Sequence, residues 1–213
     1  MNLHELKHFG YDGKNQFKIN KYNIDNFKDF GLKNFIAEKI VLFEKEISVI
    51  VARDVFKNIQ FFPPVKNIHE NGILRTSEFP ANIKKHTEKK ALKQAQKISE
   101  KINLIGLLAI EMFVLKEDDI IINELAPRPH NSGHWTLDCC NYNQFDNLIL
   151  AITNRKTKEP EILYKGKMQN ILGDEITHFN KNKPQITFYD YFKKEIKTKR
   201  KMAHFTIKEK FKT

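Results

Sequence analysis

The stretch LAIEMFVLKEDDIIINELAPRPHNSGHW, residues 108–135, decides the fold. Two apolar segments flank the polar run KEDD, which predicts an antiparallel hairpin around a turn. If Leu115 faces Ile120, the pairing places Glu111 opposite Glu124 in otherwise apolar strands. Opposed carboxylates repel, and a buried unpaired charge is costly, so we expect a cation between them. Oxygen ligands favour Mg²⁺ with a phosphate-bearing substrate. The alternative is that both glutamates face solvent or pair with lysines.

A loop dense in hydrogen-bonding side chains follows the second strand of this hairpin. Residues 123–135 carry a carboxylate, an arginine, two histidines, an asparagine and a serine, interrupted by two prolines and a glycine. A buried strand that ends in a rigid polar loop is a common way to build the wall of an active site. The alternative is a polar surface loop with helix-capping residues.

Composition places the chain among globular proteins. With 213 residues, 40% of them hydrophobic and 17 of them Phe, it can bury a sizeable core. No apolar run approaches the roughly 20 residues that span a bilayer, and the start MNLHELKHFG does not resemble a secretory signal. The only cysteines, Cys139 and Cys140, are sequence neighbours, so we expect free thiols in a reducing, cytoplasmic compartment.

The net charge of +11 is weak support for a polyanion partner. The basic residues are mostly scattered lysines, with only five arginines. Two local clusters stand out, residues 84–101 and 193–201, and the first is interpreted as the solvated face of a helix. We therefore expect neither nucleic acid nor membrane as a partner. A basic nucleic-acid-binding module stays an alternative that only the charge supports.

The remaining patterns predict a mixed α+β chain. Helices are expected where apolar residues recur every three or four positions, and strands where β-branched residues concentrate. The expected helices are residues 85–102 and 137–153, and the expected strands include residues 35–41, 47–53, 120–125, 169–172, 185–189 and 204–207. Residues 60–76 contain a Pro-Pro pair and an Asn-Gly turn with short strands on either side.

Two further segments have the composition of phosphate sites. The glycine loop Gly10–Lys14 can fold its backbone over phosphates, although the loop taken alone is more typical of a structural hairpin turn. In the basic C-terminal segment, Lys193 and Arg200 are suited to a phosphate monoester, although the composition alone favours a solvated basic tail.

Taken together, these segments resemble one family. The chain contains, in order, GYDGK, AEKIVLFEKEISVIVAR, PPVKNIHENGI, GLLAIEMF, NELAPRPHNSGHWTLD, LGD and KRKMAH. This series resembles the ATP-grasp carboxyaminoimidazole ribonucleotide synthases of purine biosynthesis, and NELAPRPHNSGH is its most specific part. The resemblance implies a core of two α+β subdomains with antiparallel sheets over residues 1–155. It implies a small β-rich unit over residues 156–213.

The resemblance also implies a reaction that uses ATP, Mg²⁺ and bicarbonate to carboxylate the exocyclic amine of aminoimidazole ribonucleotide through carboxyphosphate. Carried over by position, its catalytic residues are Asp12, Arg128 and His130. Its ATP-binding residues are Gly10, Gly13, Lys14, Glu38, Lys39, Val41, Glu46, His69 and Asn123. Its substrate-binding residues are Tyr11, Asn131, Lys193 and Arg200, and its metal ligands are Glu111 and Glu124.

The chain departs from the family pattern in length and at single positions. Family members carry a Rossmann-like domain ahead of the glycine loop, whereas Gly10 lies nine residues from Met1. We therefore expect either a separately encoded N-terminal half or an inactive or repurposed ATP-binding fragment. The family also implies a homodimer. Residues common as glycine in the family are replaced here at Phe9, Asn15 and Ala203.

Overall fold

The computed structural model describes residues 2–5, 16–19, 22–27 and 35–211, and the chain divides into two units at residues 42 and 43. In the first unit, strands β1 (Asn2–Glu5), β2 (Gln16–Lys18) and β3 (Phe35–Glu38) form an antiparallel sheet in the order β2-β1-β3. A 3-10 turn, η1, spans Ile24–Phe27. The strand predicted at residues 35–41 therefore ends three residues earlier.

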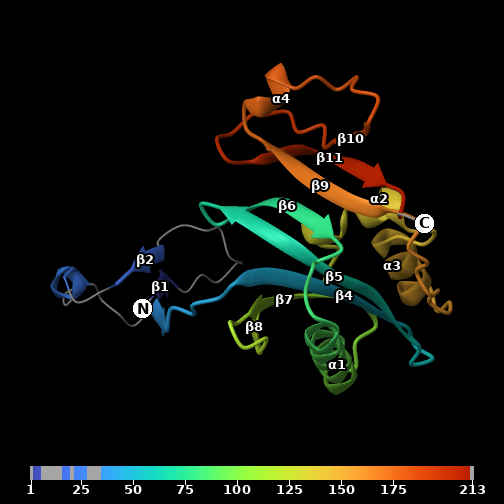
Figure 1. The fold of residues 1–213 in the computed structure, drawn as a ribbon, viewed down its shortest axis with the longest axis horizontal. Helices are drawn as coiled ribbons and strands as arrows, with labels where there is room; N and C mark the ends of the chain where they lie inside the picture. Colours follow the sequence, from blue (N-terminus) through green and yellow to red (C-terminus); the bar gives the residue numbers. More distant parts are fainter. Residues whose placement is uncertain (1, 6–15, 20–21, 28–34, 212–213) are drawn as a thin grey trace. The chain divides into compact units, whose positions relative to one another are not determined.

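The second unit is built on one antiparallel sheet of eight strands in the order β10-β11-β9-β6-β5-β4-β7-β8 (Figure 1). Its strands are β4 (Lys45–Arg53), β5 (Ile59–Glu70), β6 (Ile73–Phe79), β7 (Gly106–Val114), β8 (Ile120–Ala126), β9 (Lys165–Leu172), β10 (Ile186–Asp190) and β11 (Lys201–Glu209). Its helical segments are α1 (Lys85–Lys101), η3 (Asn131–Gly133), α2 (Thr136–Cys139), α3 (Gln144–Ile152) and α4 (Glu175–His178). The α+β class with antiparallel sheets is confirmed. The C-terminal strands join the same sheet, and a domain boundary at residues 155 and 156 stays a prediction.

Alternation along the central strands gives the sheet two buried faces. Ile47, Val49 and Val51 of β4 belong to a core cluster with Ala91 and Ala95 of α1. The residues between them point to the opposite face, because successive strand side chains alternate. The small side chains of α1 let the helix lie close to the strands, and the predicted helix ends within one residue of its expected position.

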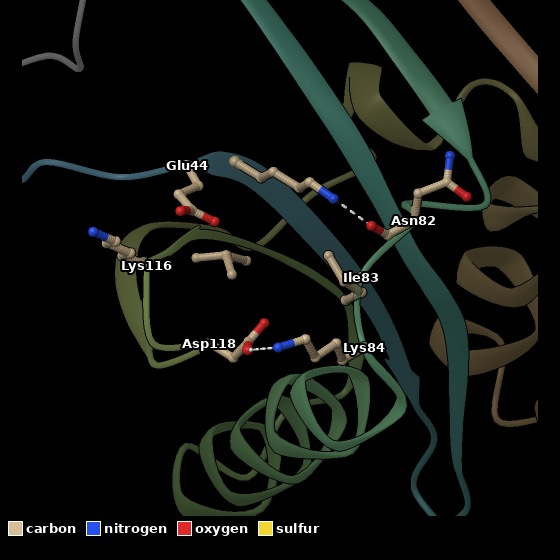
Figure 2. Close-up of a pocket in the computed structure, with 8 residues that line it drawn as sticks. Glu44, Asn82, Ile83, Lys84, Lys116 and Asp118 are labelled. Atoms are coloured by element: carbon tan, nitrogen blue, oxygen red, sulfur yellow. Dashed lines mark hydrogen bonds and ion pairs between the residues drawn. The ribbon is translucent and has the colours of Figure 1, made fainter.

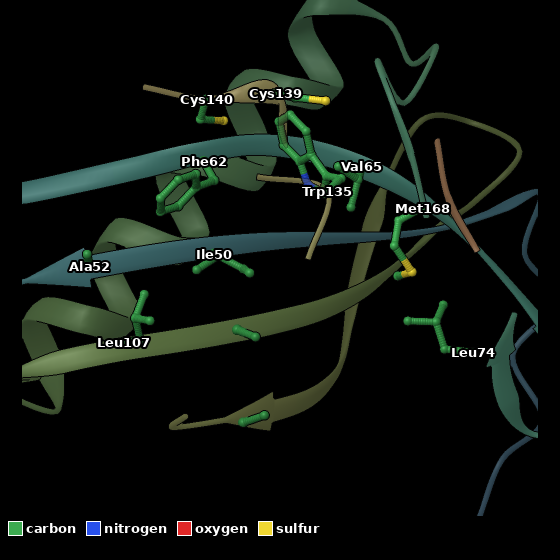
Figure 3. Close-up of a cluster of buried hydrophobic side chains, with 12 residues drawn as sticks. Ile50, Ala52, Phe62, Val65, Leu74, Leu107, Trp135, Cys139, Cys140 and Met168 are labelled. Atoms are coloured by element: carbon green, nitrogen blue, oxygen red, sulfur yellow. The ribbon is translucent and has the colours of Figure 1, made fainter. Parts of the chain in front are cut away.

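The second face is covered by the segment that follows β8. Ile50 and Ala52 of β4 form a cluster with Trp135, Cys139 and Met168, as Figure 3 shows. The indole of Trp135 is 1% exposed, and it stacks on Phe79 with ring centroids 4.8 Å apart. The loop after β8 is thereby fastened onto the face of the sheet opposite α1.

The single helix predicted at residues 137–153 is wrong. The chain forms the short α2, leaves the helix at Cys140, which bridges to Ile162, and restarts at α3. Asn143 explains the restart, because its side chain accepts from the backbone N–H groups of Phe145 and Asp146 in a capping box. Local capping outweighs the helical periodicity at this point.

The hairpin prediction is confirmed at its decisive position and corrected near its turn. Glu111 and Glu124 are direct partners, but Glu124 is exposed and only Glu111 is partly buried, so the expectation of two buried carboxylates is wrong for Glu124. The register is also shifted close to the turn, so Val114 rather than Leu115 faces Ile120. A bulge between Glu111 and Met112 compensates, and the extra residue on β8 is Asn123.

The Pro-Pro pair is accommodated in a similar way. Pro63 and Pro64 lie within β5, where the register with β4 shifts between Ser48 and Ile50. Proline lacks a backbone N–H and is tolerated at such irregularities. The turn between β5 and β6 lies at Asn71 and Gly72 as predicted.

Both cysteines, Cys139 and Cys140, are free and buried, which confirms the interpretation of the pair as thiols. Within the described residues, no helix is both long enough and apolar enough to cross a membrane.

Candidate functional site

The two glutamates of the hairpin lie on neighbouring strands at one side of the sheet. Glu111 of β7 pairs with Glu124 of β8 on one side and with Ser48 of β4 on the other. Burial raises the pKa of the Glu111 carboxyl, and the charge of Glu124 raises it further, against the opposing charge of His69. The ionised form of Glu111 is therefore disfavoured unless a cation is present. Two opposed carboxylates supply the oxygen ligands that a hard divalent cation prefers.

His130 is held with its ring in one orientation over Glu111. Its Nδ1 lies 2.8 Å from the Ser132 hydroxyl, which in turn accepts from Ser48 at 2.7 Å. The backbone N–H of Ser132 also points at Nδ1, so this nitrogen acts as the acceptor and Nε2 carries the proton. Nε2 lies 3.5 Å from a Glu111 oxygen. The ring therefore presents an N–H donor at the glutamate site.

Burial lowers the pKa of His130 to about 3, and the positive charge of Arg128 contributes. The imidazole is consequently neutral at physiological pH. It is suited to donating a hydrogen bond from Nε2, and its Nδ1 is already engaged and is not available as a base.

A second ionisable pair lies farther along the same face. His69 of β5 contacts Glu46 of β4 through its Nδ1, and each side chain is 22% exposed. Burial lowers the pKa of His69, but the hydrogen bond and charge of Glu46 outweigh it and the net shift is upward. The charges of Glu111 and Lys201 also act on His69, so the His69–Glu46 pair and the predicted metal ligand Glu111 influence one another electrostatically.

Lys201, the first residue of β11, is the site residue that sequence reasoning missed. Burial lowers the pKa of its amine, Glu111 opposes that effect, and the cations Arg128 and Lys193 reinforce it. A half-buried lysine among two glutamates and two other cations is a candidate anion ligand. The motif KRKMAH contained it, but only the fold shows that this lysine, at the start of an interior strand, lies where the charges of Glu111 and Glu124 act on its amine.

Asn131 is held by residues from the C-terminal strands. Its amide donates to Asn170 of β9 at 3.0 Å and lies 3.3 Å from the Tyr191 hydroxyl. Asn170 donates back to Asn131 and to the Leu74 carbonyl, and it is fully buried. Tyr191 is also hydrogen-bonded to Nδ1 of His204, at 2.9 Å. The C-terminal strands thus help to build the site.

The predicted phosphate pair lies near the same end of β11. Nζ of Lys193 donates to the Lys201 carbonyl at 2.6 Å, and burial followed by the charge of Arg200 lowers the pKa of Lys193. Arg200 is half-buried, with a guanidinium nitrogen 3.4 Å from the Glu195 carbonyl oxygen. Arg128 and Asn123 are exposed. The four side chains are accessible or partly accessible to a ligand.

The structure does not test the whole predicted set. Gly10, Tyr11, Asp12, Gly13 and Lys14 lie outside the described residues. The first unit contains Glu38 and Lys39, which are exposed, and Val41, which is half-buried. Among the described residues, no group of three or more His, Cys, Asp or Glu side chains is arranged to hold a metal ion.

A separate pocket of about 370 Å³ opens in the second unit (Figure 2). Two of its lysines are already paired: Lys45 donates to the Asn82 carbonyl, and Lys84 contacts Asp118 at 2.7 Å. Its lining residues are Glu44, Lys45, Asn82, Ile83, Lys84, Val114, Lys116 and Asp118. None of them is a predicted site residue, so the pocket is distinct from the glutamate site.

Comparison with known families defines the class of this fold. The model of the ATP-grasp domain matches residues 4–145, about two thirds of the chain, and the chain belongs to the ATP-grasp family. Residues 167–212 match the phosphoribosylaminoimidazole carboxylase C-terminal domain.

The similar proteins below, one by sequence and two by structure, are all described as the same enzyme. The chain is 42% identical over 205 residues to the N5-carboxyaminoimidazole ribonucleotide synthase of Bacillus subtilis, covering 93% of this chain and 53% of that protein. It is similar to an N5-carboxyaminoimidazole ribonucleotide synthetase in complex with ADP, with a TM-score of 0.89 and 39% identity over 98% of this chain and 56% of that one. The Aspergillus clavatus enzyme with ADP and 5-aminoimidazole ribonucleotide gives a TM-score of 0.86 and 29% identity, over 98% and 57%. The chain spans about half the length of these relatives.

Proposed function

We propose that this chain carries the catalytic part of an N5-carboxyaminoimidazole ribonucleotide synthase. The reaction is the ATP- and bicarbonate-dependent carboxylation of aminoimidazole ribonucleotide. The observation that carries the proposal is the pairing of Glu111 with Glu124 beside His130, Nε2 of which lies 3.5 Å from Glu111. The similarity to synthases over nearly the whole chain supports the choice of reaction.

The proposed chemistry is a phosphoryl transfer followed by a carboxylation. A bicarbonate oxygen attacks the γ-phosphorus, ADP leaves, and the carboxyphosphate formed breaks down to carbon dioxide and phosphate. The exocyclic amine then bonds to carbon dioxide and loses a proton. Such transfers depend mainly on positioning and charge stabilisation, which a set of fixed cations and donors can provide.

The described residues divide these tasks by their chemistry. Glu111 and Glu124 would hold Mg²⁺, which would neutralise the transferring phosphoryl group when bound. His130, as a neutral Nε2–H donor, would orient bicarbonate and carboxyphosphate together with Arg128. Asn131 would orient the imidazole.

The remaining roles follow the resemblance. Glu46 would hold the ribose hydroxyls of ATP, and His69 and Asn123 would line the nucleotide site. Lys193 and Arg200 would bind the ribonucleotide phosphate. The roles of residues 10–14 and 38–41, including Asp12 as the base, stay predictions, as do the cytoplasmic location, a homodimer and a separately encoded N-terminal half.

The test is ADP release from Mg-ATP and bicarbonate, with and without aminoimidazole ribonucleotide. We expect ribonucleotide-stimulated release that Glu111→Gln abolishes. Glu78→Gln is the matched control, because Glu78 of β6 bridges Lys66 and Lys167 and not the site residues.

Equal loss in both variants would show a general effect on the fold and contradict the metal assignment. A folded chain that binds Mg-ATP but shows no ribonucleotide-stimulated release, with or without an added N-terminal half, would favour a repurposed ATP-binding fragment instead.

A further inference from the structure

Gln144, the first residue of α3, is fully buried beneath the loop that carries His130. Its Oε1 accepts the backbone N–H of His130 at 2.9 Å. Its Nε2 donates to the His130 carbonyl at 2.9 Å and lies 2.9 Å from Nδ1 of His134. The carboxamide thus uses both its acceptor and its donor end, and these three partner atoms all lie in one loop.

The loop needs this partner because it has left the sheet. After β8 ends at Ala126, the buried backbone of His130 has no ladder strand to bond to, while buried N–H and C=O groups require partners. The His130 carbonyl also accepts from the Gly133 N–H at 2.9 Å, so it is the His130 N–H that depends most on Gln144. A side-chain amide offers a donor and an acceptor side by side, so it pairs with both groups of one residue as a neighbouring strand would.

The carboxamide also fixes the ring of His134. Nε2 of Gln144 has no lone pair to offer, so its contact with Nδ1 makes that nitrogen the acceptor and leaves the proton of His134 on its Nε2. The space around the amide is closed by Gly133, where an added Cβ would lie 2.9 Å from Gln144 atoms. The loop and the amide are therefore fitted to each other.

We propose that Gln144 is a positioning residue, the side chain of which holds His130 and its neighbour Asn131 in one arrangement for the reaction. The effect of Gln144 on catalysis rests on the proposed function, whereas its hold on the loop does not. His130 is then held at two points: its backbone by Gln144 and its ring by Ser132, the hydroxyl of which accepts from Ser48. Asn131 follows directly in the chain, so a shift of the His130 backbone displaces both side chains.

The same helix supplies a matched control. Asn147 is also fully buried and also clamps one backbone residue, accepting from the Lys158 N–H at 2.8 Å and donating to the Lys158 carbonyl at 3.0 Å. Lys158 lies outside the predicted site. Asn147→Leu therefore removes an equivalent clamp from the same helix without touching the loop, whereas Gln144→Met removes the clamp on His130 with little change in side-chain length.

The experiment compares the two variants in the full chain by imidazole ¹⁵N spectra at pH 7.5, with His134 assigned through a His134→Gln sample. We expect both variants to unfold at a lower temperature. Only Gln144→Met should convert His134 from the single Nε2–H form to a mixture of tautomers. Gln144→Glu keeps an acceptor for the His130 N–H but loses both donors, so it should protect that amide from hydrogen exchange while still releasing His134.

A kinetic arm connects the clamp to the reaction. Gln144→Met is expected to lower kcat for ribonucleotide-stimulated ADP release by about tenfold or more, because small displacements of positioned groups are costly, and to leave KM for ATP within roughly twofold. Asn147→Leu should leave kcat within roughly twofold. An unchanged His134 spectrum in Gln144→Met, or equal spectral and kinetic effects in both variants, would overturn the inference. Absence of turnover in the wild type would count against the proposed function alone, because the spectra still decide the role of Gln144.

Discussion

Gly133 is the position where the smallest change in the loop should have a large effect. A Cβ at residue 133 would lie 2.2 Å from Cδ1 of Ile50 and 2.9 Å from atoms of Gln144. Carbon atoms in contact are about 3.5 to 4.0 Å apart, so Ile50 would have to move by roughly 1.5 Å. Ile50 is 4% exposed within a packed cluster and has no open space to enter.

Gly133→Ala is therefore expected to destabilise the chain by about 1 to 3 kcal/mol, the usual cost of overpacking. For a chain of this size that lowers the thermal midpoint by roughly 2 to 12 °C, measurable by circular dichroism. Ile50→Val removes Cδ1, so the double variant should recover at least about 1 kcal/mol relative to the sum of the single changes. The recovery is partial because the contact with Gln144 remains.

Gly72→Ala is the control, since a Cβ at residue 72 would meet no atom within 4 Å and only the positive φ of 76° opposes it. Its cost of about 1 kcal/mol should be independent of Ile50. An unchanged midpoint in Gly133→Ala would refute the packing argument. Strict additivity with Ile50→Val would refute it as well.

Three further predictions concern buried ionisable groups. Asp54→Asn should cost about 2 to 3 kcal/mol at pH 7. One carboxylate oxygen accepts from Thr157 and the other from the backbone N–H groups of Phe56 and Asn58, whereas an amide has only one acceptor oxygen. Burial opposes the shift, yet those bonds lower the pKa of Asp54, so the advantage of the wild type is complete above about pH 4 and is lost as the pH falls through the folded pKa. Urea titrations at pH 7 and pH 3 check this. Burial lowers the pKa of His204 to about 3, so below about pH 6.5 the unfolded chain binds a proton that the native one does not. Stability should then fall by up to about 1.4 kcal/mol per pH unit from this residue, and His204→Gln should flatten the decline between pH 6.5 and 5. The raised pKa of Glu111 means that its ionised form opposes folding, so Glu111→Gln should stabilise the ligand-free chain at pH 8 by about 0.5 to 2 kcal/mol. A lower thermal midpoint in that variant would show that the carboxylate is favourably paired without metal.

The hairpin shows how far local reasoning reaches. Alternation and turn composition were enough to place Glu111 opposite Glu124, because strand pairing around a short turn involves residues close in the chain. The prediction was nevertheless wrong about the register near the turn, because no sequence pattern indicated the bulge at Asn123. The glutamates pair as predicted because the bulge offsets the one-residue shift in register near the turn.

The helix expected at residues 137–153 shows the opposite case. Its apolar spacing was helical throughout, and α3 does follow it, but the cap at Asn143 and the bridge from Cys140 to Ile162 interrupt it. The capping motif was visible in the sequence, whereas the bridge joins segments 22 residues apart and depends on the fold. The break matters because it turns Gln144 toward the loop.

The sequence by itself determined the fold class of the chain, most strands of the large sheet and the helix α1 that packs on it. It also determined the pair of glutamates and the polar loop that follows their hairpin. These features depend on periodicity, turn residues and a distinctive local motif. Only the tertiary structure decided that His130 is neutral with its proton on Nε2, that the charge of Glu111 acts on the half-buried Lys201, and that Gln144 clamps the loop. Each of these properties depends on burial or on a contact between separate elements, and a pKa or a hydrogen bond is set by the atoms that surround the group, not by its neighbours in the chain.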